Sequence, residues 1–218
     1  MRRPSVIINC AMSADGKIAS PTGRQMRISC DEDLQRMYRL RHECDAVLVG
    51  IGTIIADDPK LTVKDTYVPH PKQPVRVVLD TKGRTPPHAL VLNDAAKTIL
   101  ITAKDIGRSY EGSHIEVVEC TTDSEGYIDV HCALDILYSR GIRLLLVEGG
   151  GTIIWNFLKN KVVDDLYIYI GSCIIGGTQT PTLAEGTGVG NGEHSIPLTI
   201  VEVTRLGPGV LIHYQPLK

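Results

Sequence analysis

Short runs of β-branched and aliphatic residues recur along this chain, and segments with helical spacing separate many of them. The strand-like runs lie at residues 5–11, 46–49, about 75–79, 97–102 and 114–118, then 143–147, 166–170, 197–205 and 209–214. Strands that alternate with helices pair in parallel, because each helix carries the chain back to the start of the next strand. A Gly-Pro-Gly turn instead joins the last two runs, which is typical of a hairpin. The pattern predicts an α/β fold: a mainly parallel central sheet with helices on both faces and an antiparallel C-terminal hairpin.

Two of the expected helices carry signals for their first residues. A helix is expected at about 30–43, where Ser29 and Glu32 have the spacing of a capping box. A later amphipathic helix is expected to be capped by Asp129. No internal repeat or linker divides the chain, so residues 1–218 are predicted to form a single domain.

Composition and charge argue against several classes of protein. The 23 Lys and Arg residues nearly balance the 25 Asp and Glu residues, and the net charge of −2 lacks the basic excess that binds a nucleic-acid backbone. No apolar run approaches the ~18 to 20 residues of a membrane helix. We therefore expect a cytoplasmic protein with neither nucleic acid nor membrane as a partner.

The six cysteines are scattered, without a C-x-x-C pair or a His partner at metal-ligand spacing. This arrangement predicts neither a metal site nor a disulfide framework. We interpret the thiols as small hydrophobic side chains in a reducing compartment, and a catalytic thiol is the alternative.

Three polar or glycine-rich segments directly follow predicted strands, where open α/β sheets collect ligands. The strongest signal is the segment 149–152, three glycines and a threonine between a strand ending at Glu148 and an almost wholly apolar helix. Glycines there allow the backbone N–H groups of a helix N-terminus to approach a pyrophosphate. A tight turn is the alternative interpretation, since neither G-x-G-x-x-G nor G-K-[ST] is present.

The second segment contains Thr53 and Asp57, which lie four residues apart on one face of a short predicted helix and can bind one ligand together. The alternative is a helix cap followed by an Asp-Asp-Pro stop. Asp57 and Asp58 are disfavoured as a metal pair, because no third carboxylate or His stands at matching spacing. The third segment, residues 9–19, is a strand that runs into a polar turn.

Together and in this order, these segments resemble the reductase family of riboflavin biosynthesis, which has a dihydrofolate-reductase-like fold. The matching stretches, between roughly residues 6 and 180, are N-C-A-M-S-A-D-G-K-I-A, R-x-x-x-D-A-V-L-V-G-I-G-T-I-I-A-D-D-P-K-L-T-V, P-V-R-V-V-L-D, L-V-E-G-G-G-T and V-D-D-L-Y-I-Y-I. Each stretch alone is a weak signal, whereas the combination is highly specific. The resemblance implies that NADPH reduces the ribosyl side chain of a 5-phosphoribosylamino-pyrimidine to a ribityl chain.

The resemblance also implies roles for individual residues. The family's cofactor contacts fall on Met12, Thr53, Asp57, Thr81, Ile128, Gly149, Gly150, Gly151 and Thr152. Its substrate contacts fall on Asn9, Gln25, Arg41, Leu61, Lys64 and Glu148. Bacterial relatives carry Lys at the position of Asn9 and Arg at that of Lys64. Arg41 and Lys64 suit a phosphomonoester, although Arg41 can also be interpreted as part of a solvated helix face.

Hydride transfer needs no protein nucleophile, so the catalytic prediction concerns the proton that returns to nitrogen. Glu148 is the first candidate, because it ends a buried strand beside the glycines, and Asp15 is the second. Thr81 and the cations Lys82 and Arg84 offer partners for the 2′-phosphate of NADPH. Solvated turn charges, with NADH as cofactor, are the alternative.

Bacterial enzymes of this kind fuse the reductase to a zinc deaminase, whose paired H-x-E and P-C-x-x-C signature is absent here. We therefore expect a stand-alone reductase of the archaeal and fungal type, which acts on the diaminopyrimidinone before deamination. The alternatives are a reductase of the deaminated pyrimidine, a dihydrofolate reductase, and a nucleotide-binding module without catalysis. Because relatives form homodimers, a homodimer is expected.

Overall fold

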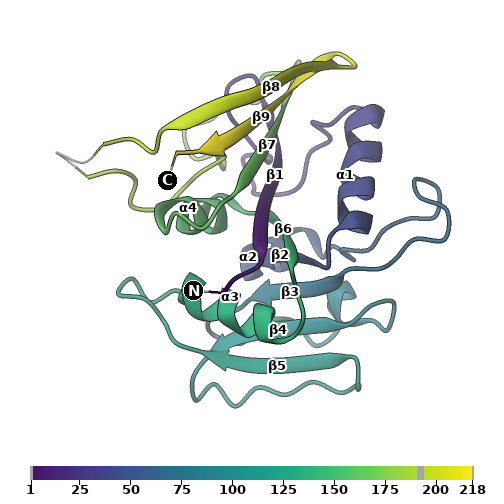
Figure 1. Cartoon of the computed structure of the whole chain (residues 1–218), viewed down its shortest axis with the longest axis vertical. Coiled ribbons are helices and arrows are strands. Elements are labelled where there is room, and N and C mark those ends of the chain that lie inside the picture. Colours follow the sequence, from purple (N-terminus) through teal and green to yellow (C-terminus); the bar gives the residue numbers. More distant parts are fainter. Residues whose placement is uncertain (1, 191–193, 218) are drawn as a thin grey trace. The chain divides into compact units, whose positions relative to one another are not determined.

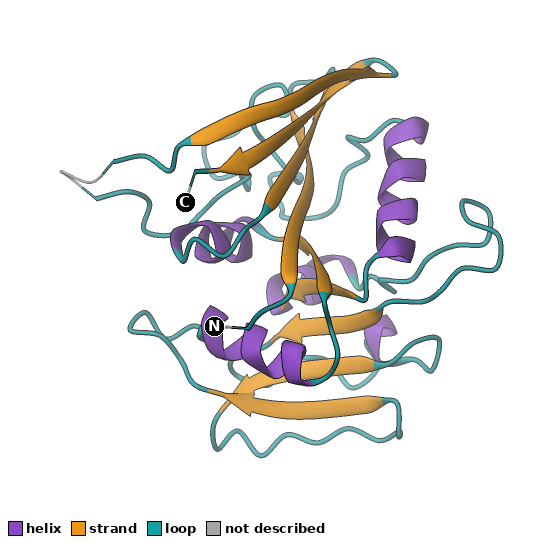
Figure 2. Ribbon diagram, in the orientation of Figure 1, coloured by secondary structure: helices purple, strands orange, loops and turns teal. Residues whose placement is uncertain are grey.

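The computed structural model describes residues 2–190 and 194–217. Within these ranges nine strands are hydrogen-bonded in the order β5-β4-β3-β2-β6-β1-β7-β9-β8 (Figures 1 and 2). The chain divides into two compact units. Unit 1 comprises the residues up to Ser5 and residues 38–146, and unit 2 comprises residues 6–37 and those from 147 onward. That the whole chain forms a single domain stays a prediction.

Unit 1 is built on parallel strands. Its strands are β2 (Ala46–Gly50), β3 (Val75–Leu79), β4 (Thr98–Ala103) and β5 (Ile115–Cys120). They pair in parallel in the order β5-β4-β3-β2. Every residue of β2 is buried, as expected of an aliphatic strand in the middle of a parallel sheet. The helices of this unit are α2 (Ile51–Asp57), the short 3-10 helix η1 (Leu90–Leu92) and α3 (Val130–Ser139).

Unit 2 contains the antiparallel end of the sheet. Its elements are β1 (Ser5–Ser13), α4 (Gly151–Lys159), β7 (Asp165–Gly171), β8 (Leu198–Leu206) and β9 (Gly209–Pro216). Only the first residue of β1, Ser5, belongs to unit 1. β1 pairs with β7 in parallel, whereas β9 is antiparallel to both β7 and β8. Two further elements have residues in both units, namely α1 (Asp31–Glu43) and β6 (Leu144–Gly149).

The predicted fold class is confirmed, since the sheet is mainly parallel and ends in an antiparallel hairpin at Gly207-Pro208. Asp129 caps α3 as expected, because its carboxylate accepts hydrogen bonds from two backbone N–H groups at 2.8 and 3.1 Å. The capping box at the start of α1 was wrong. The Ser29 hydroxyl instead donates to the carboxylate of Asp33 at 2.6 Å, because Asp33 lies one helical turn further on.

Candidate active site

The glycine turn after β6 has the backbone geometry that the sequence led us to expect. Gly149 and Gly150 adopt φ values of +87° and +84°, a region that L side chains rarely occupy. A Cβ atom on Gly151 would lie 2.6 Å from the backbone oxygen of Thr182, so only glycine fits beneath that loop. Among the residues that the structure describes, no side chain caps the N-terminus of α4. Its first N–H groups lack helical partners by geometry, which suits a phosphate or pyrophosphate.

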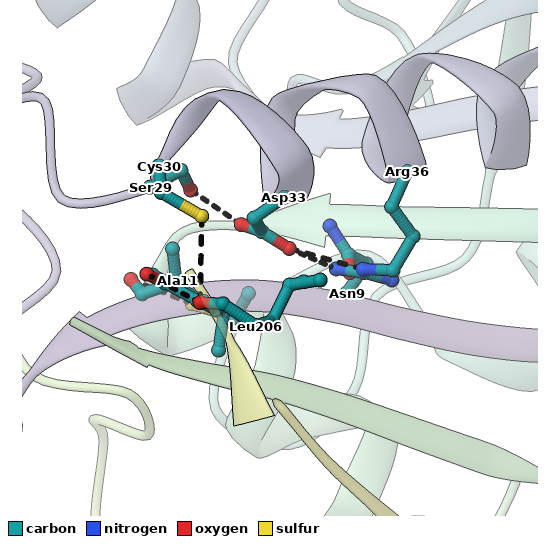
Figure 3. Close-up of polar contacts among 9 residues, drawn as sticks. Asn9, Ala11, Ser29, Cys30, Asp33, Arg36 and Leu206 are labelled. Carbon is teal, nitrogen blue, oxygen red and sulfur yellow. Dashed lines mark hydrogen bonds and ion pairs between the residues drawn. The ribbon is translucent and has the colours of Figure 1, made fainter. Parts of the chain in front are cut away.

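Asn9 lies on β1 in unit 2 and is held by a guanidinium group. Its side chain is nearly buried, and Oδ1 accepts a hydrogen bond from Nη2 of Arg36 at 2.5 Å. Arg36 also donates to Oδ1 of Asp33, from Nη2 at 2.7 Å and from Nε at 3.0 Å (Figure 3). Ser29 completes the cluster by donating to the other oxygen of Asp33. Residue 9 is therefore fixed on its strand by groups from the start of α1.

Glu148 and Met12 are the other predicted groups near the strand ends of unit 2, and both are half-buried. The next residue after Asn9, Cys10, is enclosed in this unit. Burial raises the pKa of the Cys10 thiol to about 12, and the negative charges of Asp33 and Glu148 add to the effect. Cys10 is therefore a neutral thiol at physiological pH, which argues against its use as a nucleophile.

Asp15, the second candidate proton donor, is exposed and acts as a hydrogen-bond acceptor. Its carboxylate accepts from the Ser13 hydroxyl at 2.6 Å and from the backbone N–H groups of Ile175 and Gly176 at 3.1 and 2.7 Å. These hydrogen bonds lower the pKa of Asp15 to about 2, that of Ser13 contributing most. Asp15 is thus ionised at neutral pH and holds the loop after β7 in place.

In unit 1, Thr53 and Asp57 both lie on α2, one turn apart, and both are half-buried. Thr81 follows β3 in a turn that Asp80 stabilises. Oδ2 of Asp80 accepts hydrogen bonds from both the backbone N–H and the hydroxyl of Thr85, each at 2.7 Å. Ile128, the predicted contact to adenosine, is 3% exposed, so it presents little surface to a ligand.

The predicted phosphate partners of unit 1 lie around one aromatic ring. Cζ of Arg41 and Nζ of Lys64 lie 5.4 and 5.6 Å from the centre of the Tyr38 ring. Arg41 also donates to the backbone oxygen of Thr62 at 3.0 Å, so it is not merely part of a solvated helix face. Leu61, three residues before Lys64, is buried in the left-handed region at φ 52°. Two cations with restrained side chains make a suitable partner for a dianionic phosphate.

The predicted residues fall on both units. Unit 1 carries Arg41, Thr53, Asp57, Leu61, Lys64, Thr81 and Ile128, and unit 2 carries Asn9, Met12, Asp15, Gln25, Glu148, Gly149, Gly150, Gly151 and Thr152. Gln25 is exposed in the loop between β1 and α1. The structure thus brings Arg41 and Lys64 together within unit 1 and places Glu148 directly before the glycine turn within unit 2.

The sequence analysis missed three residues that hold the predicted ones. Arg36 and Asp33 fix Asn9, and Asp80 stabilises the turn of Thr81. A signal existed only for Asp80, as an acidic residue at the end of a buried strand. Arg36 and Asp33 look like surface charges in a polar helix, and their partner on β1 is 27 positions away in the sequence.

Among the described residues, no three His, Cys, Asp or Glu side chains converge in a way that would hold a metal ion. None of the six cysteines takes part in a disulfide. The helices of residues 2–190 and 194–217 include none with the length and apolarity required to cross a bilayer.

Residues 4–212 match the sequence model of the RibD C-terminal domain. The chain belongs to this family. It is 39% identical over 212 residues to the 2,5-diamino-6-ribosylamino-4(3H)-pyrimidinone 5′-phosphate reductase of Methanothermobacter thermautotrophicus, covering 97% of this chain and 98% of that protein. It is 40% identical to the Archaeoglobus fulgidus protein of the same name, over 84% of this chain and 87% of that protein. The resemblance on which the sequence analysis relied is confirmed.

Bacterial RibD proteins match over only part of their length. The chain is 32% identical to the riboflavin biosynthesis protein RibD of Chlamydia pneumoniae, covering 97% of this chain and 57% of that protein. Among solved structures, a Thermotoga maritima deaminase and 5-amino-6-(5-phosphoribosylamino)uracil reductase superposes with a TM-score of 0.81 at 28% identity, over 99% of this chain and 57% of that chain. The Saccharomyces cerevisiae riboflavin biosynthesis reductase Rib7 has the same fold, with a TM-score of 0.76 at 20% identity, over 99% of this chain and 90% of that chain.

Proposed function

We propose that this RibD C-terminal domain protein is an NADPH-dependent reductase. Its substrate is 2,5-diamino-6-(5-phosphoribosylamino)pyrimidin-4(3H)-one, whose ribosyl side chain it converts to the ribityl form in riboflavin biosynthesis. The observation that carries this proposal is the 39% identity to an archaeal reductase of this name over nearly the full length of both chains. The runner-up is reduction of the deaminated pyrimidine, for which the Thermotoga neighbour is named.

The cofactor, when bound, supplies a hydride to the first carbon of the opened sugar. The residues fit such a group, because a turn that only glycines can adopt leads into an uncapped helix N-terminus. The backbone N–H groups of Gly151 and Thr152 would bind its pyrophosphate. Thr53 and Asp57 on α2, and Thr81 after β3, would donate and accept hydrogen bonds to its polar groups.

We infer a preference for NADPH over NADH from the cations around the turn after β3. Lys82 and Arg84 lie in this turn and are exposed. The turn packs against a third cation, since a Cβ atom on Gly83 would lie 3.3 Å from Cβ of Arg108. Three cations beside Thr81 suit the dianionic 2′-phosphate that distinguishes NADPH from NADH.

The chain's own groups would orient the substrate and move its proton. Arg41 and Lys64 bind the phosphate, and Asn9 and Glu148 hold the sugar hydroxyls. The ribosylamine opens to an imine, its first sugar carbon accepts the hydride, and a proton returns to the nitrogen. We assign the proton donation to Glu148, directly or through water, because Asp15 has a pKa of about 2 and carries no proton to give at neutral pH.

We also propose that the protein is a cytoplasmic homodimer. β8 is last in the strand order and exposes an apolar row of Leu198, Ile200, Val201 and Val203, the exposed fraction reaching 58% at Ile200 and Val203. Exposed apolar residues on an edge strand favour pairing with another chain, and a second copy is the occupant we propose. Six cysteines outside any disulfide are consistent with a reducing compartment.

A spectrophotometric assay of NADPH oxidation tests the function. The purified protein is offered the phosphoribosylamino-diaminopyrimidinone, its deaminated analogue and dihydrofolate, each with NADPH and with NADH. We expect the highest kcat/KM with the diaminopyrimidinone and NADPH. A higher value with the deaminated analogue would move the enzyme to the later step, and turnover of dihydrofolate alone would replace the proposal. No oxidation with any substrate would indicate a binding module.

A further inference from the structure

The contact between Arg36 and Asn9 dictates which way the Asn9 amide faces. A guanidinium group has five N–H donors and no acceptor, so an amide that contacts it must present its oxygen. Oδ1 of Asn9 accordingly lies 2.5 Å from Nη2 of Arg36 (Figure 3). The NH₂ group of Asn9 therefore points away from Arg36, and the side of the amide that faces away from Arg36 presents N–H donors.

Arg36 is itself fixed on two sides. Asp33 is 2% exposed and accepts two hydrogen bonds from Arg36 and one from the Ser29 hydroxyl. Both oxygens of this carboxylate therefore have hydrogen-bond donors within the cluster. Cζ of Arg36 lies 5.8 Å from the centre of the Tyr167 ring, which stacks on His213 with 4.2 Å between ring centres. A guanidinium group that turned away from Asn9 would also break its hydrogen bonds to Asp33.

We propose that Arg36 and Asp33 are positioning residues, which lock Asn9 as a hydrogen-bond donor to an oxygen acceptor of the substrate. The identity of that acceptor, a hydroxyl oxygen of the sugar chain, rests on the proposed function. A sugar hydroxyl both accepts and donates. Asn9 offers outward N–H donors and Glu148 offers carboxyl oxygens, so the two side chains are complementary partners for hydroxyl groups.

An ion pair with a purely structural role would need only Arg36 and Asp33, which are three residues apart on the same helix. The bond to Asn9 instead reaches a residue on β1, to which the proposed function assigns a contact with the substrate. Arg36 therefore affects turnover through Asn9 and not by contact with substrate.

Double-variant kinetics test this dependence. The variants are Asn9→Ala, Arg36→Met, Arg36→Lys and Asn9→Ala/Arg36→Met, with kcat and KM measured at saturating NADPH. The matched control is Arg27→Met, which removes an exposed ion pair to Asp31 near the same end of α1 without touching Asn9. We expect Asn9→Ala and Arg36→Met each to lower kcat about 10- to 100-fold, and the control to retain wild-type kcat.

The double variant should be no more than about twofold slower than Asn9→Ala. Without the Asn9 amide, Arg36 has no side chain left to orient, so its loss should have little further effect on kcat. Arg36→Lys should recover part of the loss, since an ammonium group still donates to Oδ1. It also keeps the charge beside Asp33, so it remains informative if Arg36→Met fails to fold. Losses that multiply in the double variant, or a control as slow as Arg36→Met, would overturn the proposal.

A second readout separates this proposal from the proposed function. In ¹⁵N-labelled protein, the side-chain NH₂ signal of Asn9 is identified by its loss in Asn9→Ala. We expect this signal to shift in Arg36→Met and to stay in place in Arg27→Met. A wild-type protein that oxidises no NADPH with any pyrimidine refutes the function, while a shifted Asn9 signal still supports the locked amide. An unmoved signal refutes the positioning role, whatever the activity.

Discussion

Substitution of Gly151 by alanine tests the role of the glycine turn, because the added methyl group would clash with neighbouring atoms. Its Cβ would lie 2.6 Å from the backbone oxygen of Thr182 and 2.7 Å from Cγ of Glu185. The loop that carries these atoms is tied to the same helix start. The N–H of Glu185 donates to the Gly151 oxygen at 3.0 Å, and Oε1 of Glu185 accepts from the N–H of Thr182 at 2.9 Å. Either this loop or the first turn of α4 must move.

The expected loss of stability depends on whether the atom in contact with the new methyl group can move. A clash with a restrained backbone oxygen has the cost of an overpacked core, about 1 to 3 kcal/mol. For a chain of this size that lowers Tm by roughly 2 to 12 °C. If the first turn of α4 moves, its N–H groups leave the pyrophosphate, and kcat/KM for NADPH should fall about 10- to 100-fold.

Gly52→Ala is the matched control for stability. Gly52 also lies in the first turn of a helix, but a Cβ atom there meets nothing within 4 Å. Alanine should therefore stabilise this position by about 0.5 to 1 kcal/mol. Urea unfolding followed by circular dichroism measures both variants, and initial rates at varied NADPH measure the cofactor effect. A Gly151→Ala protein as stable as Gly52→Ala, with wild-type kcat/KM for NADPH, would refute the reasoning.

Three further changes test other parts of the structure. Glu148→Gln should lower kcat strongly with little change in Tm, because it removes the proposed proton donor and keeps the side-chain shape; unchanged turnover would remove Glu148 from the mechanism. The pKa of Asp15 falls from 3.8 to about 2 on folding, so its stabilisation is complete above about pH 4 and is lost as the pH falls through 2. Asp15→Asn should accordingly unfold at lower urea than wild type at pH 7 and at equal urea near pH 2, and a gap that persists at pH 2 would contradict this. Ile200→Lys/Val203→Lys should give the mass of one chain by light scattering where wild type gives two, whereas a double variant that still has the mass of two chains would place the interface elsewhere.

Most of the fold could be predicted from local patterns. β2 is an aliphatic run of five residues, and burial of every one of them explains why its sequence has no polar alternation. The carboxylate of Asp129 caps α3 because an Asp before an amphipathic run has two free N–H groups within reach. The three-residue helix η1 was missed, since one turn is too short to show a period.

Long-range polar contacts could not be predicted in the same way. Ser29 lies just before α1, but its hydroxyl donates to Asp33 instead of forming the expected capping box. Arg36 has the spacing of a surface residue, and only the position of β1 beside it reveals that Asn9 is its partner. The sequence contains the residues of such a cluster but not the distances between them, because they come from segments that meet only after the sheet has formed.

The small net charge of the chain conceals an uneven distribution of functional charge. The cations assigned to phosphate groups, Arg41, Lys64, Lys82, Arg84 and Arg108, are all in unit 1. The groups of unit 2 assigned to the reacting sugar are an amide and a carboxylate, and its contribution to phosphate binding is uncharged backbone. The guanidinium group that contacts Asn9 is that of Arg36, and Asp33 neutralises it by accepting two hydrogen bonds from it at Oδ1. Asp33 thereby allows an arginine to orient Asn9 without imposing its charge on the chemistry, which is a reason for the two residues to occur as a pair.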